Sequence, residues 1–136
     1  MSRIFITGGH GILGSKLVEK LSISNIVCSP NKEECDITDY ESVHRNINEF
    51  KPNILIHCAA FVDTIGCEND KNKAIDNNII GTINIVKCLL NINCKFIYIS
   101  SEYVFGGDKG NYTVDDRLNP KNVYGKTKAA SEYIVS

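Results

Sequence analysis

Tyr124 and Lys128 are four residues apart and are the pair in this chain best suited to proton transfer. On a helix this spacing puts both side chains on one face, where an ammonium can lower the pKa of a phenol and also hold a ribose hydroxyl. Ser100 and Ser101 stand at the end of an apolar run that begins at residue 95, and a hydroxyl there can bind the same carbonyl oxygen as the phenol. The set suits proton transfer coupled to hydride transfer. Because a Tyr and a Lys at this spacing are common by chance, the interpretation needs a second motif.

The second motif is a run of glycines, Gly8, Gly11 and Gly14, between an apolar β-rich run at residues 3–7 and a helical pattern at residues 12–21. A strand, a glycine turn and a helix in this order are typical of a dinucleotide-binding loop. Gly8 allows the sharp turn, Gly11 lets backbone N–H groups approach a pyrophosphate at the helix N-terminus, and Gly14 permits close packing of helix on strand. The alternative is a tight turn with no ligand.

The end of the second expected strand bears on the choice of dinucleotide. NAD-binding domains usually place an acidic residue there, but this chain has Ser29, Pro30, Asn31 and Lys32. An uncharged side chain with Lys32 nearby can accept a 2′-phosphate, so NADPH is favoured over NADH; an ordinary solvated Lys32 is the alternative. Asp36 and Ile37 follow and could reach an adenine, or Asp36 could cap a turn.

The elements that must position these residues alternate between strand and helix. Apolar runs predict strands at residues 3–7, 26–28, 54–58 and 95–100, and helical periodicity predicts helices at residues 12–21, 39–50 and 73–90 and from Val123 onward. The predicted fold is a doubly wound α/β domain over residues 1–136, a parallel Rossmann-like sheet with strand order 3-2-1-4. Residues 101–122 are expected to form a long functional loop.

Composition excludes several other classes of protein. Fifteen basic and sixteen acidic residues give a net charge of −1, so no positive field is available for nucleic acid or an anionic membrane surface. No apolar run is long enough for a membrane span, and the N-terminus does not read as a signal peptide. The six cysteines and three histidines show no metal-ligand spacing, which predicts reduced thiols in a cytoplasmic protein without a metal site.

Taken together, these residues resemble the extended short-chain dehydrogenase/reductase superfamily, and within it the dTDP-4-dehydrorhamnose reductase family. The resemblance covers the whole chain and is most specific over residues 100–110 and 119–128. Residues 6–14 are similar to that family's cofactor loop, residues 36–39 to its adenine-contacting segment, residues 57–60 to the loop beneath the nicotinamide ribose, and residues 78–81 to the helix that supports the active site. The cofactor contacts that the resemblance implies are Gly8, His10, Gly11, Ile12, Leu13, Asp36, Ile37, Cys58, Ala59, Ala60, Asn78, Tyr124 and Lys128.

The resemblance also implies an activity. Ser101 would orient a substrate carbonyl, Tyr124 would donate the proton, and Lys128 would hold the ribose and tune Tyr124. The implied reaction is reduction of a 4-keto group on a 6-deoxy nucleotide sugar by NADPH or NADH, for polysaccharide synthesis. Homodimers are common among such proteins, with the helix at residues 73–90 and the final helix as the expected interface. Ser101 and Glu102 stand where the family usually has Thr and Asp, and because Ser101 keeps the hydroxyl, this departure affects the expected chemistry little. Gly106 and Ile65 also depart from positions where Asp is frequent, and these two departures affect expected substrate contacts.

Members of this family are roughly twice as long as this chain, so we expect it to be the N-terminal piece of a longer enzyme, without the lobe that closes over the sugar nucleotide. Two other functions fit the same motifs. One is a non-catalytic cofactor-binding subunit, like the regulatory subunit of methionine adenosyltransferase, which resembles the same family. The other is a nucleotide-sugar epimerase or dehydratase. A dehydratase is less favoured because Glu102 is the only acidic residue directly after Ser101.

Overall fold

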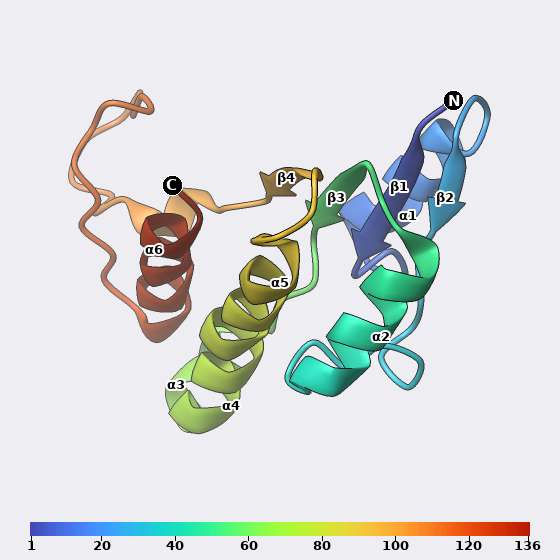
Figure 1. Cartoon of the computed structure of the whole chain (residues 1–136). Coiled ribbons are helices and arrows are strands. Elements are labelled where there is room, and N and C mark those ends of the chain that lie inside the picture. Colours follow the sequence, from blue (N-terminus) through green and yellow to red (C-terminus); the bar gives the residue numbers. More distant parts are fainter.

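A four-stranded parallel sheet with helices on both faces forms the protein, whose computed structural model describes residues 1–136 (Figure 1). The strands are β1 (Arg3–Thr7), β2 (Ile26–Cys28), β3 (Ile54–His57) and β4 (Lys95–Tyr98). The helices are α1 (Ile12–Leu21), α2 (Tyr40–Phe50), α3 (Thr64–Asn69), α4 (Lys71–Ile75), α5 (Gly81–Leu89) and α6 (Val123–Val135), with a π-helical segment η1 (Asp76–Ile80) and a 3₁₀ turn η2 (Glu102–Val104). The doubly wound α/β fold is therefore confirmed.

The strand order differs from the prediction. Neighbouring strands follow the order β2-β1-β3-β4, with β3 paired to β1 from Ile4↔Ile54 to Thr7↔His57, so the predicted order 3-2-1-4 is wrong. β3 is central because it pairs with both β1 and β4, whereas the three-residue β2 pairs only with β1, leaves Ile26 45% exposed and forms an edge. Because β2 and β3 lie on opposite sides of β1, the chain changes direction there. A crevice at the carboxyl ends of the strands beside such a reversal is the usual ligand site of these folds.

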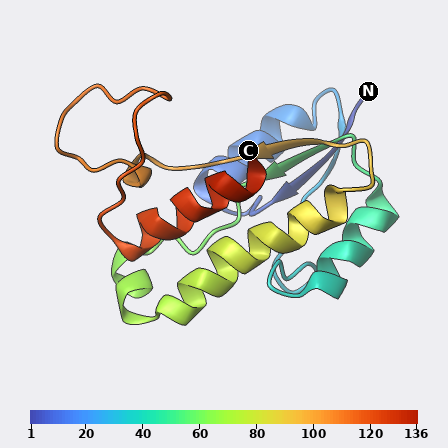
Figure 2. The same cartoon turned by 60° about the vertical axis from the view of Figure 1, so that its left-hand side comes forward.

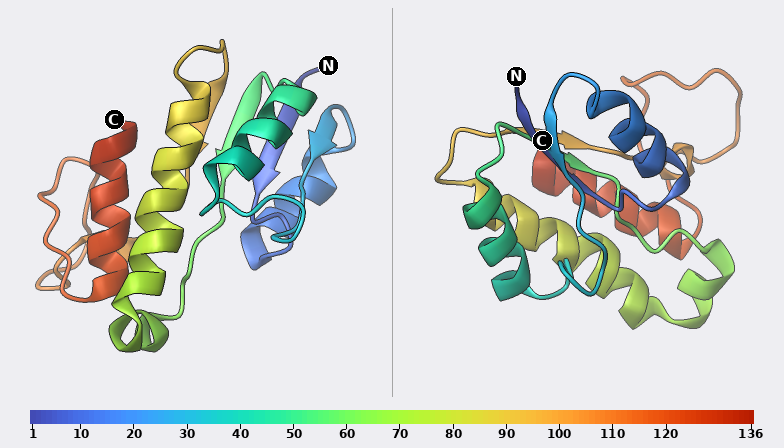
Figure 3. Two further views of the ribbon diagram at one scale, coloured as in Figure 1. Left: turned by 60° about the horizontal axis from the view of Figure 1, so that its bottom comes forward. Right: turned by 90° about the vertical axis from the view of Figure 1, so that its right-hand side faces the viewer.

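Two apolar layers hold the helices to the sheet. Phe5 and Leu55 face α2 and α5 and share a core with Val43, Ile47 and Ile85. On the other face, Ile4, Ile6 and Ile56 pack against the apolar residues of α1, as its periodicity predicts. Figure 3 shows α1 alone on its side of the sheet, with α2, α5 and α6 on the opposite side. Figure 2 shows α6 running beside α5, so the helix that carries Tyr124 and Lys128 is supported laterally.

The helix predicted at residues 73–90 begins earlier and is not uniform. It runs from α4 through η1 into α5, so it contains a π-helical turn at residues 76–80 that apolar periodicity does not reveal. The expected loop before it contains α3, whose six residues, Gly66 among them, are too few for a periodic pattern. Asp63 caps α3 by accepting a hydrogen bond from the Gly66 N–H at 3.0 Å, and this Asp was the one sequence feature that could have marked its start.

All six cysteines are free thiols. None of the helices combines the length and the apolar character that a membrane crossing requires.

A buried amide holds the segment at residues 36–37 against α5, and this contact can be tested. The Asn84 Nδ2 donates to the Ile37 carbonyl at 2.9 Å in the interior. We expect Asn84→Ala to lower the free energy of unfolding by about 1–3 kcal/mol, because that carbonyl loses a buried donor. The matched control is Asn77→Ala on the same helical run, whose partly exposed side chain bonds only the Lys73 carbonyl, with an expected change within about 0.5 kcal/mol. Urea unfolding measures both variants, and equal losses of unfolding free energy in Asn84→Ala and Asn77→Ala would contradict this expectation.

Candidate functional site

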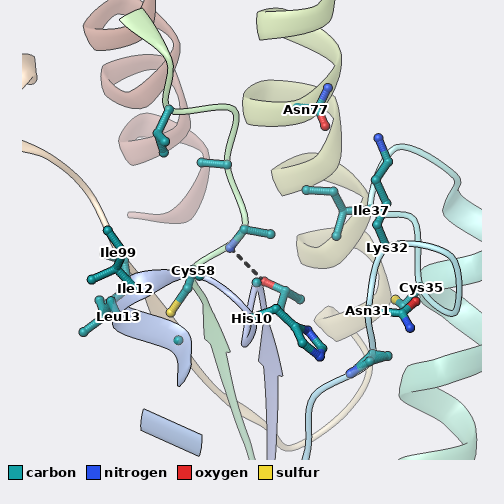
Figure 4. A pocket seen from close by; sticks show the side chains of 18 of the residues that line it. His10, Ile12, Leu13, Asn31, Lys32, Cys35, Ile37, Cys58, Asn77 and Ile99 are labelled. Carbon is teal, nitrogen blue, oxygen red and sulfur yellow. Dashed lines mark hydrogen bonds between the residues drawn. The ribbon is translucent and has the colours of Figure 1, made fainter. Parts of the chain in front are cut away.

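A cavity of about 670 Å³ lies at the carboxyl ends of the strands, where the chain reverses direction. Figure 4 shows Ile12, Leu13, Cys58 and Ile99 at one end, Asn31, Lys32, Cys35 and Ile37 at the other, and His10 between them. The structure brings most of the predicted site residues into its wall: Gly8, His10, Gly11, Ile12, Leu13, Asp36, Ile37, Cys58, Ala59, Ala60, Tyr124 and Lys128. Ser101 and Asn78 do not line it.

The glycine turn forms the floor of the cavity because backbone packs there on backbone. Gly8 has φ of 69°, and a β-carbon on it would lie 2.6 Å from the Ala59 nitrogen at the end of β3. A β-carbon on Gly14 would lie 2.7 Å from the Gly9 Cα and closer still to the Gly8 carbonyl oxygen. Helix α1 has no side-chain cap and no acidic residue in its first turn, so its N-terminal N–H groups and positive dipole end are available to an anion.

The residues after β2 differ in what they contact: Ser29 bonds the protein backbone, whereas Asn31 and Lys32 line the cavity. Ser29 was one of the residues expected to read a 2′-phosphate, but its hydroxyl donates to the Ile6 carbonyl at 3.0 Å and lies against Gly9, outside the cavity wall. Asn31 and Lys32 do line the cavity, and Lys32 makes no ion pair. Lys32 is therefore the cation at this end that is available to a phosphate.

Asp36 caps a turn, which is one of the two alternatives for this residue, and it also lines the cavity. Its carboxylate accepts hydrogen bonds from the Thr38 N–H at 2.9 Å and the Thr38 hydroxyl at 2.8 Å. Burial alone would raise the pKa of Asp36, but these two bonds and the nearby Lys32 lower it. The residue is thus a fixed carboxylate beside Ile37.

Lys128 is 4% exposed and lies at the cavity wall, where its Nζ donates to the Ile99 carbonyl at 2.6 Å. Burial lowers the pKa of Lys128 to about 8, although Cys58 and Glu132 favour its charged form. Tyr124 has a raised pKa, mainly through burial and also through Glu102, whereas the Ser101 hydroxyl lowers it. Lys128 is not among the groups that shift Tyr124, so the expected tuning of the phenol by Lys128 does not appear in this geometry.

Ser101 lies beside Tyr124 rather than in the cavity wall. Its hydroxyl donates to the Glu102 carboxylate at 3.0 Å and accepts from the Tyr103 N–H at 3.3 Å. The neighbouring Ser100 lines the cavity and donates to the Glu132 carboxylate. Both serines therefore stand at the β4 end near the phenol.

Asn78 is buried, and all its bonds are internal. Its Oδ1 accepts from the Phe61 N–H at 2.7 Å, and its Nδ2 donates to the Phe61 carbonyl at 3.1 Å and to the Thr127 hydroxyl at 2.9 Å. Asn78 thus ties the loop after β3 to α6 instead of facing the cavity. The residue that does face it from this helix is Asn77, which sequence reasoning missed because a π-helical turn changes which positions point outward.

His57 is the buried histidine beneath this site. Its ring lies between the hydroxyls of Thr7, at 2.6 Å from Nδ1, and Thr82, at 3.2 Å from Nε2. Burial, and then the charge of Lys128, lower the pKa of His57 to about 3, so the ring is neutral at physiological pH. No three His, Cys, Asp or Glu side chains come together as a metal site.

The family model described as the RmlD substrate binding domain matches residues 1–136. The chain belongs to this family. Among curated proteins, it is 36% identical to methionine adenosyltransferase 2 subunit beta of Rattus norvegicus over 98% of the chain and 42% of that protein. It is 35% identical to dTDP-4-dehydrorhamnose reductase of Mycolicibacterium smegmatis over 98% of the chain and 41% of that protein.

Solved structures agree with this assignment. The crystal structure of dTDP-4-dehydrorhamnose reductase from Bacillus anthracis in complex with NADP superposes with a TM-score of 0.94 at 34% identity, over 98% of this chain and 48% of that one. The resemblance to the reductase family is therefore confirmed. The chain spans less than half the length of these relatives.

Gly11 and Gly14 differ in how closely the backbone packs around them, and this difference can be tested. We expect Gly14→Ala to lower the free energy of unfolding by roughly 1–3 kcal/mol, because its methyl group meets backbone that cannot move aside. Gly11 caps α1 in an extended conformation, and its nearest non-neighbour atom would lie 3.3 Å from a β-carbon, so Gly11→Ala should cost less than about 1 kcal/mol. Urea unfolding of both variants measures the difference; a Gly11→Ala loss as large as that of Gly14→Ala would refute it.

Proposed function

We propose that this chain forms the NADPH-binding and proton-donating part of a reductase that acts on the 4-keto group of a 6-deoxy nucleotide sugar, in the synthesis of deoxysugar polysaccharides. One observation carries the proposal: the glycine turn and the Tyr124–Lys128 pair, which are 110 or more positions apart, line a single cavity. The relatives named as dTDP-4-dehydrorhamnose reductases support this reaction class.

The cavity fits a dinucleotide in size and in chemistry. The uncapped N-terminus of α1 suits a pyrophosphate, and Gly11 leaves room for it. Asp36 and Ile37 stand at one end for the adenosine, and Cys58, Ala59 and Ala60 border the other end with Lys128 for the second ribose. When bound, NADPH supplies a hydride to the keto carbon.

The chain's own residues supply the proton and the alignment. Tyr124 keeps its phenol protonated at neutral pH because burial raises its pKa, so it is a donor to a developing alkoxide. The hydroxyl of Ser101, beside the phenol, can bind the same oxygen and orient it. Lys128 lies at the cavity wall, where its Nζ donates a hydrogen bond to the Ile99 carbonyl and can also bind a cofactor ribose.

Lys32 should distinguish the two nicotinamide cofactors. In calorimetric titrations of the chain at one fixed ionic strength, we expect tighter binding of NADPH than of NADH. Lys32→Ala should weaken NADPH binding by about tenfold and leave NADH binding unchanged, because Lys32 makes no ion pair within the protein and the 2′-phosphate is the group that NADH lacks. Lys16→Ala, which removes an exposed lysine paired with Glu19, is the matched control. Equal affinity for the two cofactors in the unsubstituted chain would overturn the preference for NADPH.

Tyr124 should be required for turnover but not for cofactor binding. In the native protein that carries this sequence, Tyr124→Phe should reduce the rate of keto-sugar reduction by about 10²–10⁴-fold, because the proton donor is lost. NADPH affinity should be retained, since the ring and Lys128 remain. Tyr133→Phe on the same helix, where Tyr133 is 75% exposed, is the control. If the Tyr124→Phe protein keeps its turnover, the proposed mechanism is wrong.

A second candidate is a non-catalytic cofactor-binding subunit. The 36% identity to methionine adenosyltransferase 2 subunit beta favours it. Bound NADPH, no reduction of any keto-sugar by the unsubstituted protein, and comigration with a methionine adenosyltransferase catalytic subunit in gel filtration would together replace the reductase proposal with this one.

The remaining parts of the proposal concern partners and location. A nucleotide sugar is the proposed substrate partner, and the family resemblance implies a homodimer formed through the helical run at residues 73–90 and α6. The six free thiols suit a reducing compartment, so we place the protein in the cytoplasm.

A further inference from the structure

Tyr98 is the last residue of β4, and its ring lies beneath the ammonium of Lys128. The Lys128 Nζ stands 4.1 Å from the centroid of the Tyr98 ring. The Tyr98 ring also contacts the ring of His57 in a tilted arrangement, with centroids 5.8 Å apart. Lys128, Tyr98 and His57 thus form a cluster that joins the cavity wall to the buried His57 ring.

The Lys128 ammonium in this cluster needs stabilisation by the protein, because it is removed from water. Lys128 is almost fully buried and forms no ion pair, and its one hydrogen bond within the protein is to the Ile99 carbonyl. Glu132, one turn along α6, accepts a hydrogen bond from Ser100. Charged groups removed from water are costly without compensation, and the negative face of an aromatic ring is one of the few neutral groups that attract a cation.

The Tyr98 ring, and not the Tyr98 hydroxyl, contacts the Lys128 ammonium. The Tyr98 Oη is buried without a hydrogen-bond partner. Ser131 lies beside it and lowers the pKa of Tyr98 against the larger effect of burial, while the Ser131 hydroxyl donates to the Asn78 carbonyl at 2.7 Å. Because an unpaired buried hydroxyl is itself destabilising, a phenylalanine at this position would keep the useful contact and remove the cost.

We propose that Tyr98 is a positioning residue for Lys128: the face of its ring supports the buried ammonium and holds it at the cavity wall. The inference concerns the protein without ligand and rests on the proposed function only for its consequence, which is that a charged Lys128 is presented to the cofactor ribose.

The groups that face Lys128 are compatible with this role. From the sheet, His57 and Tyr98 are both neutral at physiological pH, because burial lowers the pKa of His57 to about 3 and raises that of Tyr98 to about 12. Cys58 at the end of β3 and Glu132 on α6 favour the ammonium form. The Tyr98 ring therefore adds to the stabilisation of the ammonium by Cys58 and Glu132, and neither His57 nor Tyr98 carries a positive charge.

The direct test is the titration of Lys128 itself by NMR of ¹³Cε and ¹⁵Nζ in lysine-labelled chain, with the resonance assigned by its loss in Lys128→Met. We expect Tyr98→Phe to titrate as the unsubstituted chain does, near pH 8, with equal or greater stability. Tyr98→Leu should titrate about one pH unit lower, the tenfold change that loss of a desolvated cation–π contact implies. Phe96→Leu is the matched control, because Phe96 lies two residues earlier on β4 and contacts His57 but not Lys128.

Replacing Tyr98 by pentafluorophenylalanine tests the same point if Tyr98→Leu fails to fold. Fluorination keeps the ring shape and reverses the sign of its face, so it should also lower the pKa of Lys128. A Lys128 pKa that is unchanged in both Tyr98→Leu and the fluorinated protein would overturn the proposal, as would a Phe96→Leu shift equal to that of Tyr98→Leu.

The same variants separate this inference from the proposed function. Cofactor binding is measured by NADPH titration at pH 7.5, near the expected Lys128 pKa. A lowered Lys128 pKa with a matching loss of NADPH affinity supports both ideas. A lowered pKa with unchanged affinity supports the positioning role of Tyr98 and refutes the role of Lys128 toward the cofactor.

Discussion

The close contact of backbone with backbone where the β1–α1 turn meets the end of β3 is the constraint on which the site depends. Gly8 lies so near Ala59 that a side chain there would enter the space of its main chain, and Gly14 lies in the same relation to Gly8 and Gly9. The Thr7 hydroxyl adds a bond from the Ala59 N–H at 3.3 Å. With these contacts the two loops form one continuous floor. The N-terminus of α1 and the Cys58–Ala60 segment can therefore face a single ligand.

The sequence predicted the elements well because their signals are local. Apolar runs gave β1 and β2 their observed bounds, and helical spacing did so for α1. The strand order could not be predicted in the same way, because it depends on which strand is buried on both sides. The stretch at residues 29–39 forms turns and no strand, so β2 stays at the edge and β3 takes the place beside β1. A pattern that registers only apolar character does not distinguish a short edge strand from a central one.

The candidate site was predictable where the residue type itself is the signal. Glycines with a required spacing, and a Tyr and Lys one helical turn apart, need no knowledge of the rest of the fold. Ser29 and Asn78, which do not line the cavity, are held by partners elsewhere in the chain. Ser29 is occupied by the Ile6 carbonyl, and Asn78 by the Phe61 backbone and Thr127. Hydrogen bonds over 17 to 49 positions in sequence cannot be read from a local motif.

The pKa shifts of Tyr124 and Lys128 determine which of these groups carry a proton at neutral pH, and this bears on the proposed reduction. Burial raises the pKa of Tyr124, so the phenol keeps its proton at neutral pH and can give it to an oxygen that gains charge. Burial lowers the pKa of Lys128 to about 8, so below that pH most of the protein carries a charged donor, and above it the charge is lost. Both groups therefore hold their protons together only on the acidic side of pH 8. Reduction of a carbonyl consumes a proton whereas oxidation of an alcohol releases one, so these protonation states are compatible with the proposed reduction at neutral pH, and the charge on Lys128 is lost as the pH rises.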